Sequence, residues 1–387
     1  MKVVRGELFA VPPRWLFLRL EADDGTVGWG EPIVEGRAAT VATAVQELLE
    51  YVIDTDPRRV EDTFQALYRG GFYRGGPILT SAISGIEQAL WDIKARALGV
   101  PVHELLGGRV RDRIRVYAWI GGDRPEEASA AALERLDQGY RAVKMNATAE
   151  AGYSEPPAFV RSVLDRARAV RDAIGAEADL ALDFHGRVHT ALAARLLDAL
   201  REVEPMFVEE PVLPEHLDVL PELARRTPIP LATGERLFTR WGFRDLLRRG
   251  GVAIVQPDVS HAGGIWETRK IAAMAEAHDV AVAPHCPLGP IALASALQVD
   301  ACTPNALIQE ESFGIHYNSG GEVDSYVRDA DWLLPSEGYV AVPDGPGLGI
   351  DVEEEAVRVA AERAARDGAK TWRNPVWRLT DASVAEW

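Results

Sequence analysis

Several features that mark other classes of protein are scarce in this chain of 387 residues. Only two cysteines occur, Cys286 and Cys302, which excludes a disulfide scaffold or cysteine-cluster zinc site and is typical of a reducing cytoplasm. No stretch approaches the roughly 18 apolar residues of a membrane span, and the first residues lack the apolar stretch of an export signal. We therefore expect a cytoplasmic protein that neither enters a membrane nor is exported.

The chain also has fewer basic than acidic residues, with 42 Lys and Arg, 59 Asp and Glu, and a formal net charge of −17. This balance disfavours nucleic acid and anionic membrane surfaces as partners. A small anionic substrate is still compatible, because a metal ion and a few local cations can reverse the field inside one cleft. Hydrophobic residues make up 47% of the chain, which is enough for a large core.

The N-terminal part of the chain has the pattern of a sheet followed by helices. Strand-like runs at 15–20 and 27–30 flank a turn signal, Asp23-Asp24-Gly25. Apolar residues at helical spacing then predict helices over 38–53, 60–68 and 81–98. Residues 1–110 are therefore predicted to form an α+β module.

Short apolar runs then alternate with helical patterns, which is typical of a (β/α)-barrel. The predicted barrel strands are 114–120, 142–146, 180–185, 206–210, 230–235, 253–258, 280–285 and 306–310. The predicted barrel domain spans residues 111–318. Beyond it the periodicity fades, and we expect residues 319–387 to run back and complete the N-terminal module.

Most of the predicted barrel strands end in a polar residue. The ends that carry chemistry are Asp183, Glu209 or Glu210, Glu235, Asp258, His285 and Glu310. Because the carboxyl ends of barrel strands meet at one mouth, where barrel enzymes keep their active sites, we expect these side chains to share a site.

The carboxylates at three successive strand ends, Asp183, Glu209 and Glu235, predict a metal site. They would repel one another in a poorly solvated mouth, and a hard dication relieves that repulsion. Ligation by oxygen alone favours Mg²⁺ or Mn²⁺ over zinc. Side chains alternate along a strand, so Glu209 and Glu210 point to opposite faces, and the pattern does not choose between them. A single strand-end carboxylate is also compatible with simple solvation.

Histidines follow two of these strands. His185 lies on the same strand face as Asp183, two residues away, and is a candidate general acid or base. Asp258 and His285 end neighbouring strands, and a carboxylate beside an imidazole fixes its tautomer and raises its basicity. His285 is thus the predicted base, although His261 competes as the partner of Asp258. Metal, base and acid together predict β-elimination of water from a 2,3-dihydroxy acid through an ene-diolate.

The series of strand-end residues resembles the mandelate racemase-like branch of the enolase superfamily, and wider segments resemble its D-galactonate dehydratases. Those segments are 12–15, 28–32, 71–77, 182–188, 260–264, 283–290, 314–318 and 383–387, so the similarity covers nearly the whole chain. The resemblance implies a modified TIM barrel of the enolase type, an N-terminal α+β capping domain completed by the C-terminal tail, and a homo-oligomer.

The resemblance also implies a role for each residue. Three carboxylates would bind Mg²⁺, with Glu209 chosen over Glu210: Asp183, Glu209 and Glu235. His285, supported by Asp258, would abstract the C2 proton of D-galactonate. His185 would protonate the departing C3 hydroxyl, and Glu310 would stabilise the transition state. The product would be 2-dehydro-3-deoxy-D-galactonate, made by a hydro-lyase of carbohydrate catabolism.

One departure from the racemases of this branch is informative. Those enzymes carry Lys-x-Lys after the second barrel strand, whereas this chain has Lys144-Met145-Asn146. Asn146 cannot act as a base, because an amide does not titrate usefully, so racemisation is disfavoured. Lys144, Asn146 and Trp15 are the expected substrate contacts, although Lys144 is equally compatible with a solvated strand end. Glu31 and Glu35 lie in the same N-terminal loop region as Trp15.

Three alternatives stay open. The substrate could be gluconate, mannonate or a related epimer, since the chemistry would be unchanged and only the placement of one hydroxyl differs. An isomerase could use the same proton abstraction, although the missing second lysine disfavours it. A barrel of this fold could also bind an acid sugar without turning it over.

Overall fold

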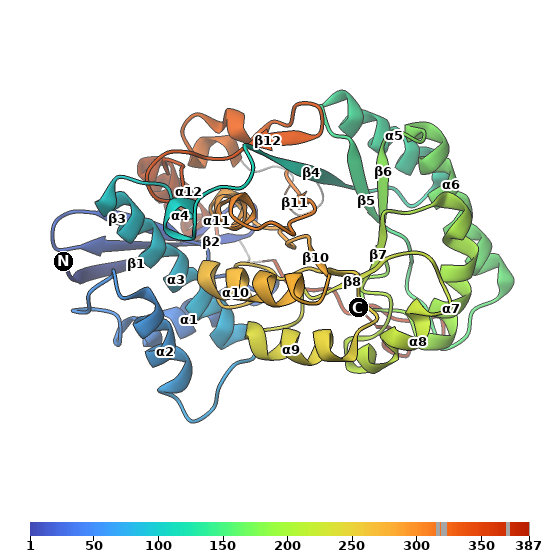
Figure 1. The fold of residues 1–387 in the computed structure, drawn as a ribbon, viewed down its shortest axis with the longest axis horizontal. Coiled ribbons are helices and arrows are strands. Elements are labelled where there is room, and N and C mark those ends of the chain that lie inside the picture. Colours follow the sequence, from blue (N-terminus) through green and yellow to red (C-terminus); the bar gives the residue numbers. More distant parts are fainter. Residues whose placement is uncertain (315–317, 319–322, 369–371, 387) are drawn as a thin grey trace.

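The structure is a computed structural model that describes residues 1–314, 318, 323–368 and 372–386. It combines an antiparallel sheet with its helices and a ring of parallel strands surrounded by helices (Figure 1). Within the described ranges, no helix is both long and apolar enough to cross a lipid bilayer.

The N-terminal part consists of three strands and four helices. The antiparallel sheet has the order β1-β2-β3 and comprises β1 (Val3–Val11), β2 (Trp15–Ala22) and β3 (Val27–Gly30). The helices are α1 (Ala38–Leu49), α2 (Val60–Arg69), α3 (Pro77–Leu98) and α4 (Val102–Leu105). Gly30 allows β3 to lie directly on α3, because a Cβ there would sit 2.0 Å from the Gly85 carbonyl oxygen. This close contact helps to place α3 at the boundary with the barrel.

Eight strands form the parallel part of the second sheet, and the predicted barrel is confirmed. They are β4 (Arg113–Ile120), β5 (Ala142–Asn146), β6 (Asp179–Asp183), β7 (Phe207–Glu209), β8 (Leu231–Thr233), β9 (Ile254–Val255), β10 (Ala281–Val282) and β11 (Gln309–Glu311). The ring closes because β11 pairs with β4 and Ala306, just before β11, bridges Val282 of β10. The carboxyl ends of these strands therefore meet at one mouth.

Helices cover the outside of the ring (Figure 1). They are α5 (Pro125–Asp137), α6 (Pro157–Ile174), α7 (Thr190–Ala199), α8 (Leu220–Ala224), α9 (Thr239–Arg249), α10 (Ile265–Glu276) and α11 (Pro290–Ala301). The inside of the ring is filled by one inward side chain from most strands, including Tyr117, Ala181, Phe207 and Ala232. The barrel is thus a packed core below its mouth.

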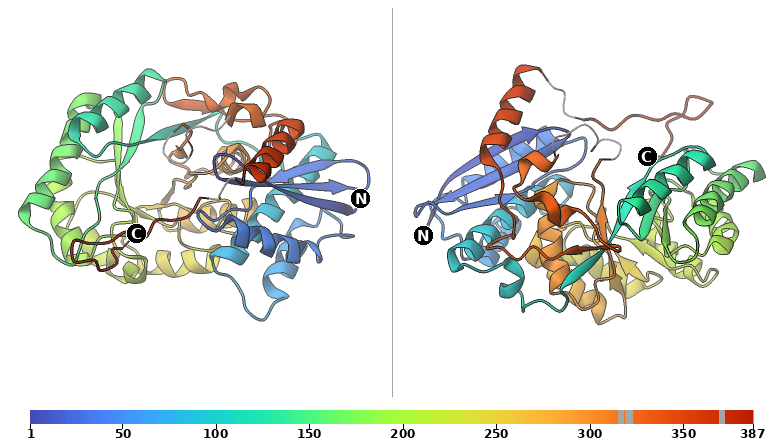
Figure 2. Two further views of the ribbon diagram at one scale, coloured as in Figure 1. Left: turned by 180° about the vertical axis from the view of Figure 1, so that it is seen from behind. Right: turned by 90° about the horizontal axis from the view of Figure 1, so that it is seen from above.

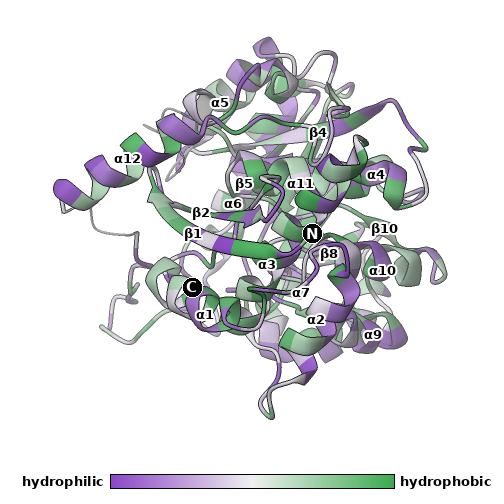
Figure 3. Ribbon diagram, turned by 90° about the vertical axis from the view of Figure 1, so that its left-hand side faces the viewer, coloured by the Kyte–Doolittle hydropathy of each residue, from purple (hydrophilic) through white to green (hydrophobic). Residues whose placement is uncertain are grey.

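After β11 the chain returns to the N-terminal sheet. The strand β12 (Tyr339–Ala341) pairs antiparallel with β4, and α12 (Glu354–Arg366), along which hydrophilic and hydrophobic residues alternate (Figure 3), lies on β1. The Arg358 guanidinium stacks 4.9 Å from the Phe9 ring centre and lies 3.0 Å from the Glu7 carboxylate. The C-terminal segment therefore completes the capping part of the fold, as predicted.

The last described residues, 372–386, extend along the barrel (Figure 2). The guanidinium carbon of Arg187, in the loop after β6, lies 4.6 Å from the centre of the Trp377 ring. The domain limits themselves stay a prediction, and the predicted boundary after residue 318 adjoins 319–322, which lie outside the described residues.

Candidate active site

The strand ends bring the predicted metal-binding carboxylates together at the mouth. Asp183 ends β6 and pairs in register with Glu209, the last residue of β7, while Glu235 follows β8 by two residues. Asp183 and Glu235 line a cavity of about 390 Å³, and Glu209 is fully buried below it. The three side chains thus meet at the carboxyl ends of the barrel strands, as the strand pattern predicts, while their role as metal ligands stays a prediction.

Glu209 and Glu210 point to different partners. Both oxygens of Glu209 accept hydrogen bonds from the Lys144 ammonium, at 2.9 and 2.8 Å. Glu210 instead lies 3.1 Å from the Arg236 guanidinium and accepts hydrogen bonds from Thr233 and from the Gly234 amide. The alternation expected from the strand pattern is thus present, and Glu209 is the one that faces the cavity-lining Lys144.

Lys144 on β5 is buried between two carboxylates. Its ammonium lies 2.8 Å from Glu209 and 2.9 Å from Glu310, and its side chain is 1% exposed. Burial alone would lower the pKa of Lys144, but the charges of Glu209 and Glu310 outweigh it and raise this pKa well above its ordinary value. The head of Lys144 is therefore a buried counter-charge rather than a solvated strand-end ammonium.

His185 stands directly after β6 in the left-handed backbone region, with φ of +56°. This turn lets its amide donate to Asp183 at 2.5 Å, while its Nδ1 lies 3.2 Å from the other Asp183 oxygen. His185 also lines the cavity. The burial of Asp183 would raise its pKa, but His185 and Lys144 lower it, so this carboxyl is ionised.

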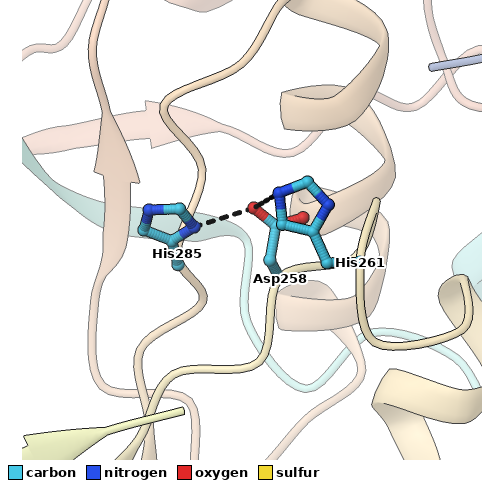
Figure 4. A group of neighbouring side chains, drawn as sticks. All are labelled: Asp258, His261 and His285. Carbon is cyan, nitrogen blue, oxygen red and sulfur yellow. Dashed lines mark hydrogen bonds and ion pairs between the residues drawn. The ribbon is translucent and has the colours of Figure 1, made fainter. Parts of the chain in front are cut away.

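Asp258, which follows β9, lies between two histidines (Figure 4). One of its oxygens accepts a hydrogen bond from Nδ1 of His285 at 2.8 Å and lies 3.7 Å from Nε2 of His261. The shorter distance identifies His285 as its main partner. The second nitrogen of His285, Nε2, points to Glu235 at 3.0 Å and lines the cavity.

The charges around His285 favour the protonated form of its imidazole in the metal-free chain. Burial alone would lower the pKa of its imidazole, but Glu235, Glu310 and Asp258 outweigh burial and raise this pKa well above 6.5.

Glu310 at the end of the barrel also accepts a hydrogen bond from the Cys286 amide at 2.9 Å. Burial raises the pKa of the Cys286 thiol well above its usual range, so this cysteine is a packing residue rather than a nucleophile.

Two groups of side chains could be considered for a metal ion. Asp258, His261 and His285 bring their ligand atoms within 4.8 Å of one another, but their nitrogens already bond to Asp258, Glu235 and Ser81. Asp183, Glu209 and Glu235 offer carboxylate oxygens alone, which is the donor set that Mg²⁺ prefers. Burial and the neighbouring carboxylates outweigh Lys144 and raise the pKa of Glu209 to about 8, which shows the excess of negative charge that a dication would relieve.

Two predicted substrate contacts lie away from the cavity lining. Trp15 is 1% exposed and packs against Phe17 and Tyr326 in the core beneath the N-terminal sheet, so its position gives no support to a substrate contact. Asn146 ends β5 opposite Asp183, and its side-chain oxygen is buried without a hydrogen-bond partner. Neither is among the residues that line the cavity in the described part of the chain.

Sequence reasoning missed part of the cavity wall. Glu35 and His261, which the sequence had singled out in the N-terminal loop region and as a second partner for Asp258, do line the cavity. The lining residues that it did not name as site residues include Arg14, Trp119, Arg236, Asn318, Trp372 and Asn374. Arg236 could have been noticed, because a cation directly follows a predicted metal ligand. Trp372 and Asn374 carry no such signal, since they belong to a tail that reaches the mouth only in the folded chain.

The comparisons with known proteins agree with this geometry. Residues 127–356 match the enolase C-terminal domain-like family, and residues 12–107 match the N-terminal domain of the mandelate racemase / muconate lactonizing enzyme family. D-galactonate dehydratases of Ralstonia nicotianae and Pectobacterium atrosepticum are 53% and 51% identical to the chain, each over the full length of both proteins.

A solved structure also supports the assignment to this family. An enolase from Agrobacterium radiobacter, with sodium and L-malate bound, is 31% identical and superposes over the full length of both chains with a TM-score of 0.90. The family predicted from the strand-end residues is therefore confirmed. The chain belongs to the mandelate racemase / muconate lactonizing enzyme branch of the enolase superfamily, in the family of the D-galactonate dehydratases.

Proposed function

We propose that this protein is a hydro-lyase that converts D-galactonate to 2-dehydro-3-deoxy-D-galactonate and water. The chain is similar over its full length to D-galactonate dehydratases. The observation that carries the proposal is that His185 and His285 line one cavity. Asp183 and Glu235 line the same cavity. An acid and a base beside buried carboxylates suit the removal of water from a hydroxy acid.

The proposed metal ligands are Asp183, Glu209 and Glu235, with Mg²⁺ as the cofactor and Mn²⁺ as the alternative of the same ligand preference. Bound Mg²⁺ supplies the positive charge that makes the proton at C2 of the substrate more acidic. In the protein alone, each of these carboxylates is balanced by a different side chain: His185 for Asp183, Lys144 for Glu209 and His285 for Glu235. These partners offset only part of the negative charge of the three carboxylates, which leaves a role for a dication.

His285 is the proposed base. Its Nδ1 donates to Asp258 at 2.8 Å, which leaves Nε2 to take the C2 proton from a substrate in the cavity. Asp258 holds the imidazole in this tautomer and stabilises the imidazolium that forms. Asp258 and Glu310 favour the imidazolium that forms, and Glu235 would be drawn away from Nε2 when it holds a metal ion, so that the neutral ring is available to accept the C2 proton.

His185 is the proposed acid for the C3 hydroxyl. It is held by Asp183 and borders the same cavity as His285, so one histidine can remove a proton while the other gives one to the leaving group. Lys144, which lines the cavity, is proposed to bind the substrate carboxylate, and Glu310, 2.9 Å from the Lys144 ammonium, to act on the developing charge through this lysine.

A turnover screen tests the proposed activity. The purified protein is incubated with Mg²⁺ and a panel of epimeric hexonates and pentonates, and the 2-keto-3-deoxy product is measured. Activity confined to D-galactonate and abolished by EDTA supports the proposal. Activity on another epimer would keep the chemistry and replace the substrate. Metal binding without turnover of any acid sugar would overturn the proposal in favour of a binder or an isomerase.

The two histidines are tested by following C2 exchange and elimination separately. His285→Asn is expected to abolish both the exchange of the C2 proton with solvent deuterium and the loss of water, because no base is left. His185→Asn is expected to impair elimination while exchange continues, since the ene-diolate can still form. Full elimination activity in both variants would refute the assignment.

A further inference from the structure

The carboxylate of Glu35 lines the active-site cavity but has no part in the proposed chemistry. Glu35 lies in the loop between β3 and α1, and its side chain is 21% exposed. One oxygen, Oε2, lies 3.4 Å from Nε2 of His261. The other, Oε1, is buried and has no hydrogen-bond partner in the protein. A buried carboxylate oxygen without a partner is costly, so a ligand that donates to it would be bound favourably.

His261 holds Glu35 in place from the barrel side. It is 6% exposed, its Nδ1 lies 3.1 Å from the hydroxyl oxygen of Ser81 on α3, and its Nε2 faces Glu35 and Asp258. Burial would lower the pKa of His261, but Asp258 and Glu35 outweigh it and raise this pKa to about 9. The doubly protonated ring therefore donates to Ser81 and to Glu35, which occupies Oε2 and leaves Oε1 for a ligand.

The charge state of Glu35 limits what that ligand can be. Burial would raise the pKa of its carboxyl, but His261, Arg14 and His285 outweigh burial and hold this pKa well below its ordinary value. An ionised carboxylate can only accept hydrogen bonds. The group that meets Oε1 must therefore be a donor, and in a hydroxy acid the available donors are hydroxyl groups.

The position of Glu35 shows which hydroxyls are within reach. The proposed metal ligands lie at the ends of β6 to β8, and His285 stands next to them through Glu235. His261, in the loop after β9, and Glu35, from the N-terminal domain, line the same cavity as His285, with the His261 and His285 ring centres 6.4 Å apart. When the carboxylate of a substrate is at the metal ligands and its C2 is at His285, the carbons beyond C3 are the part of the substrate left to meet Glu35.

We propose that Glu35, oriented by His261, accepts a hydrogen bond from a hydroxyl of the distal C4–C6 part of the substrate and is a specificity-determining residue. This inference rests on the proposed function. It selects polyhydroxy acids with a long distal chain over shorter acids that share the same reacting centre, because the shorter acids leave Oε1 without a donor.

Glu35→Gln tests the inference, because it preserves shape and replaces one carboxylate oxygen by a donor. Two quantities are measured: kcat/KM for D-galactonate, and the inhibition constant of the four-carbon acid with the same configuration at C2 and C3. We expect kcat/KM for D-galactonate to fall by about 10- to 100-fold. We expect the inhibition constant of the four-carbon acid to change by less than about threefold, since its contacts at the metal end are unaffected.

Two further variants make the result decisive. Glu35→Asp keeps the charge on a shorter stem and is expected to retain more selectivity for D-galactonate than Glu35→Gln. Glu47→Gln makes the same chemical change on the exposed face of α1 and should behave as wild type. If Glu35→Gln weakened both acids equally, or neither, the inference would be overturned. Absence of D-galactonate turnover in the wild type would instead refute the proposed function, and the comparison would then use the epimer that is turned over.

Discussion

The ion pairs of Lys144 allow one prediction to be worked out from the structure. Lys144→Met keeps most of the apolar stem and removes the ammonium that Glu209 and Glu310 share. Its nitrogen lies 2.8 and 2.9 Å from the two carboxylates, and all three side chains are at most 2% exposed. Removing one partner of a buried ion pair typically costs about 3–5 kcal/mol. We expect a loss of this size in the free energy of unfolding, measured by urea titration in EDTA.

A matched variant separates the loss of the ion pairs from the loss of one lysine. Lys94→Met removes the same charge from α3, where the ammonium lies 4.7 Å from the centre of the Trp91 ring and forms no ion pair within the described residues. A cation–π contact of this kind contributes about 0.5–1 kcal/mol. Adding Glu310→Gln to Lys144→Met should recover part of the loss, because one uncompensated carboxylate is removed. A Lys144→Met protein no less stable than Lys94→Met would refute the assignment of Lys144 as a buried counter-charge.

Two other predictions concern the support of the base and of α10. Asp258→Asn should lower both C2 exchange and elimination by about 10²- to 10⁴-fold, with little change in D-galactonate affinity; unchanged exchange kinetics would remove Asp258 from the proposed mechanism. Burial raises the pKa of Glu87, which accepts from the Ile265 and Trp266 amides, from 4.5 to about 8. When a pKa is higher in the folded chain than in the unfolded chain, the group contributes its full stability at a pH below the unfolded-state pKa. That contribution to the free energy of unfolding is lost as the pH rises toward and through the folded-state pKa. The unfolding free energy of wild type relative to Glu87→Gln should therefore fall by up to about 1.4 kcal/mol per pH unit between pH 4.5 and 8, and a difference independent of pH would contradict this.

The barrel could be predicted because its signal is local. Each strand is a short apolar run, and each run ends in residues whose positions follow from the strand period alone, as with Asp183 and His185. The ring geometry then brings these ends together without further information. The sequence pattern therefore predicted both the eight strands and the side of the barrel on which the chemistry lies.

The helix α12 was not predicted, and the reason lies in what holds it. Only Val357 and Ala360 are fully buried along it, so it lacks the broad apolar stripe that marks a helix in a sequence. Its other contacts are ionic and link distant parts of the chain, such as Arg358 with Glu7 and Glu354 with Arg19. These two pairs depend on the tertiary fold, whereas the Glu354–Arg358 pair within α12, four residues apart at 2.6 Å, is a helix signal that the sequence did carry.

In the site, too, the sequence predicted features that depend on neighbouring residues but not contacts between residues far apart in the chain. The sequence predicted which residues end the strands, but it did not predict that Lys144 bonds to both Glu209 and Glu310. Those partners come from other strands and meet only when the ring closes. The choice between His285 and His261 as the partner of Asp258 also had to wait for the distances, 2.8 against 3.7 Å.

A usable signal for the capping side was nevertheless present in α3. Apolar spacing marks this helix as buried, yet Ser81, Ser84 and Gln88 lie on one face of it, three and four residues apart. Buried polar side chains must find hydrogen-bond partners, so such a face predicts that α3 packs against irregular backbone rather than another apolar surface. The structure supplies that backbone in the loop after β9: Ser84 accepts from the Gly263 amide at 2.9 Å, and Gln88 donates to Ser260 at 3.0 Å. Because the same loop carries His261, the polar face of α3 links the N-terminal domain directly to the wall of the active site.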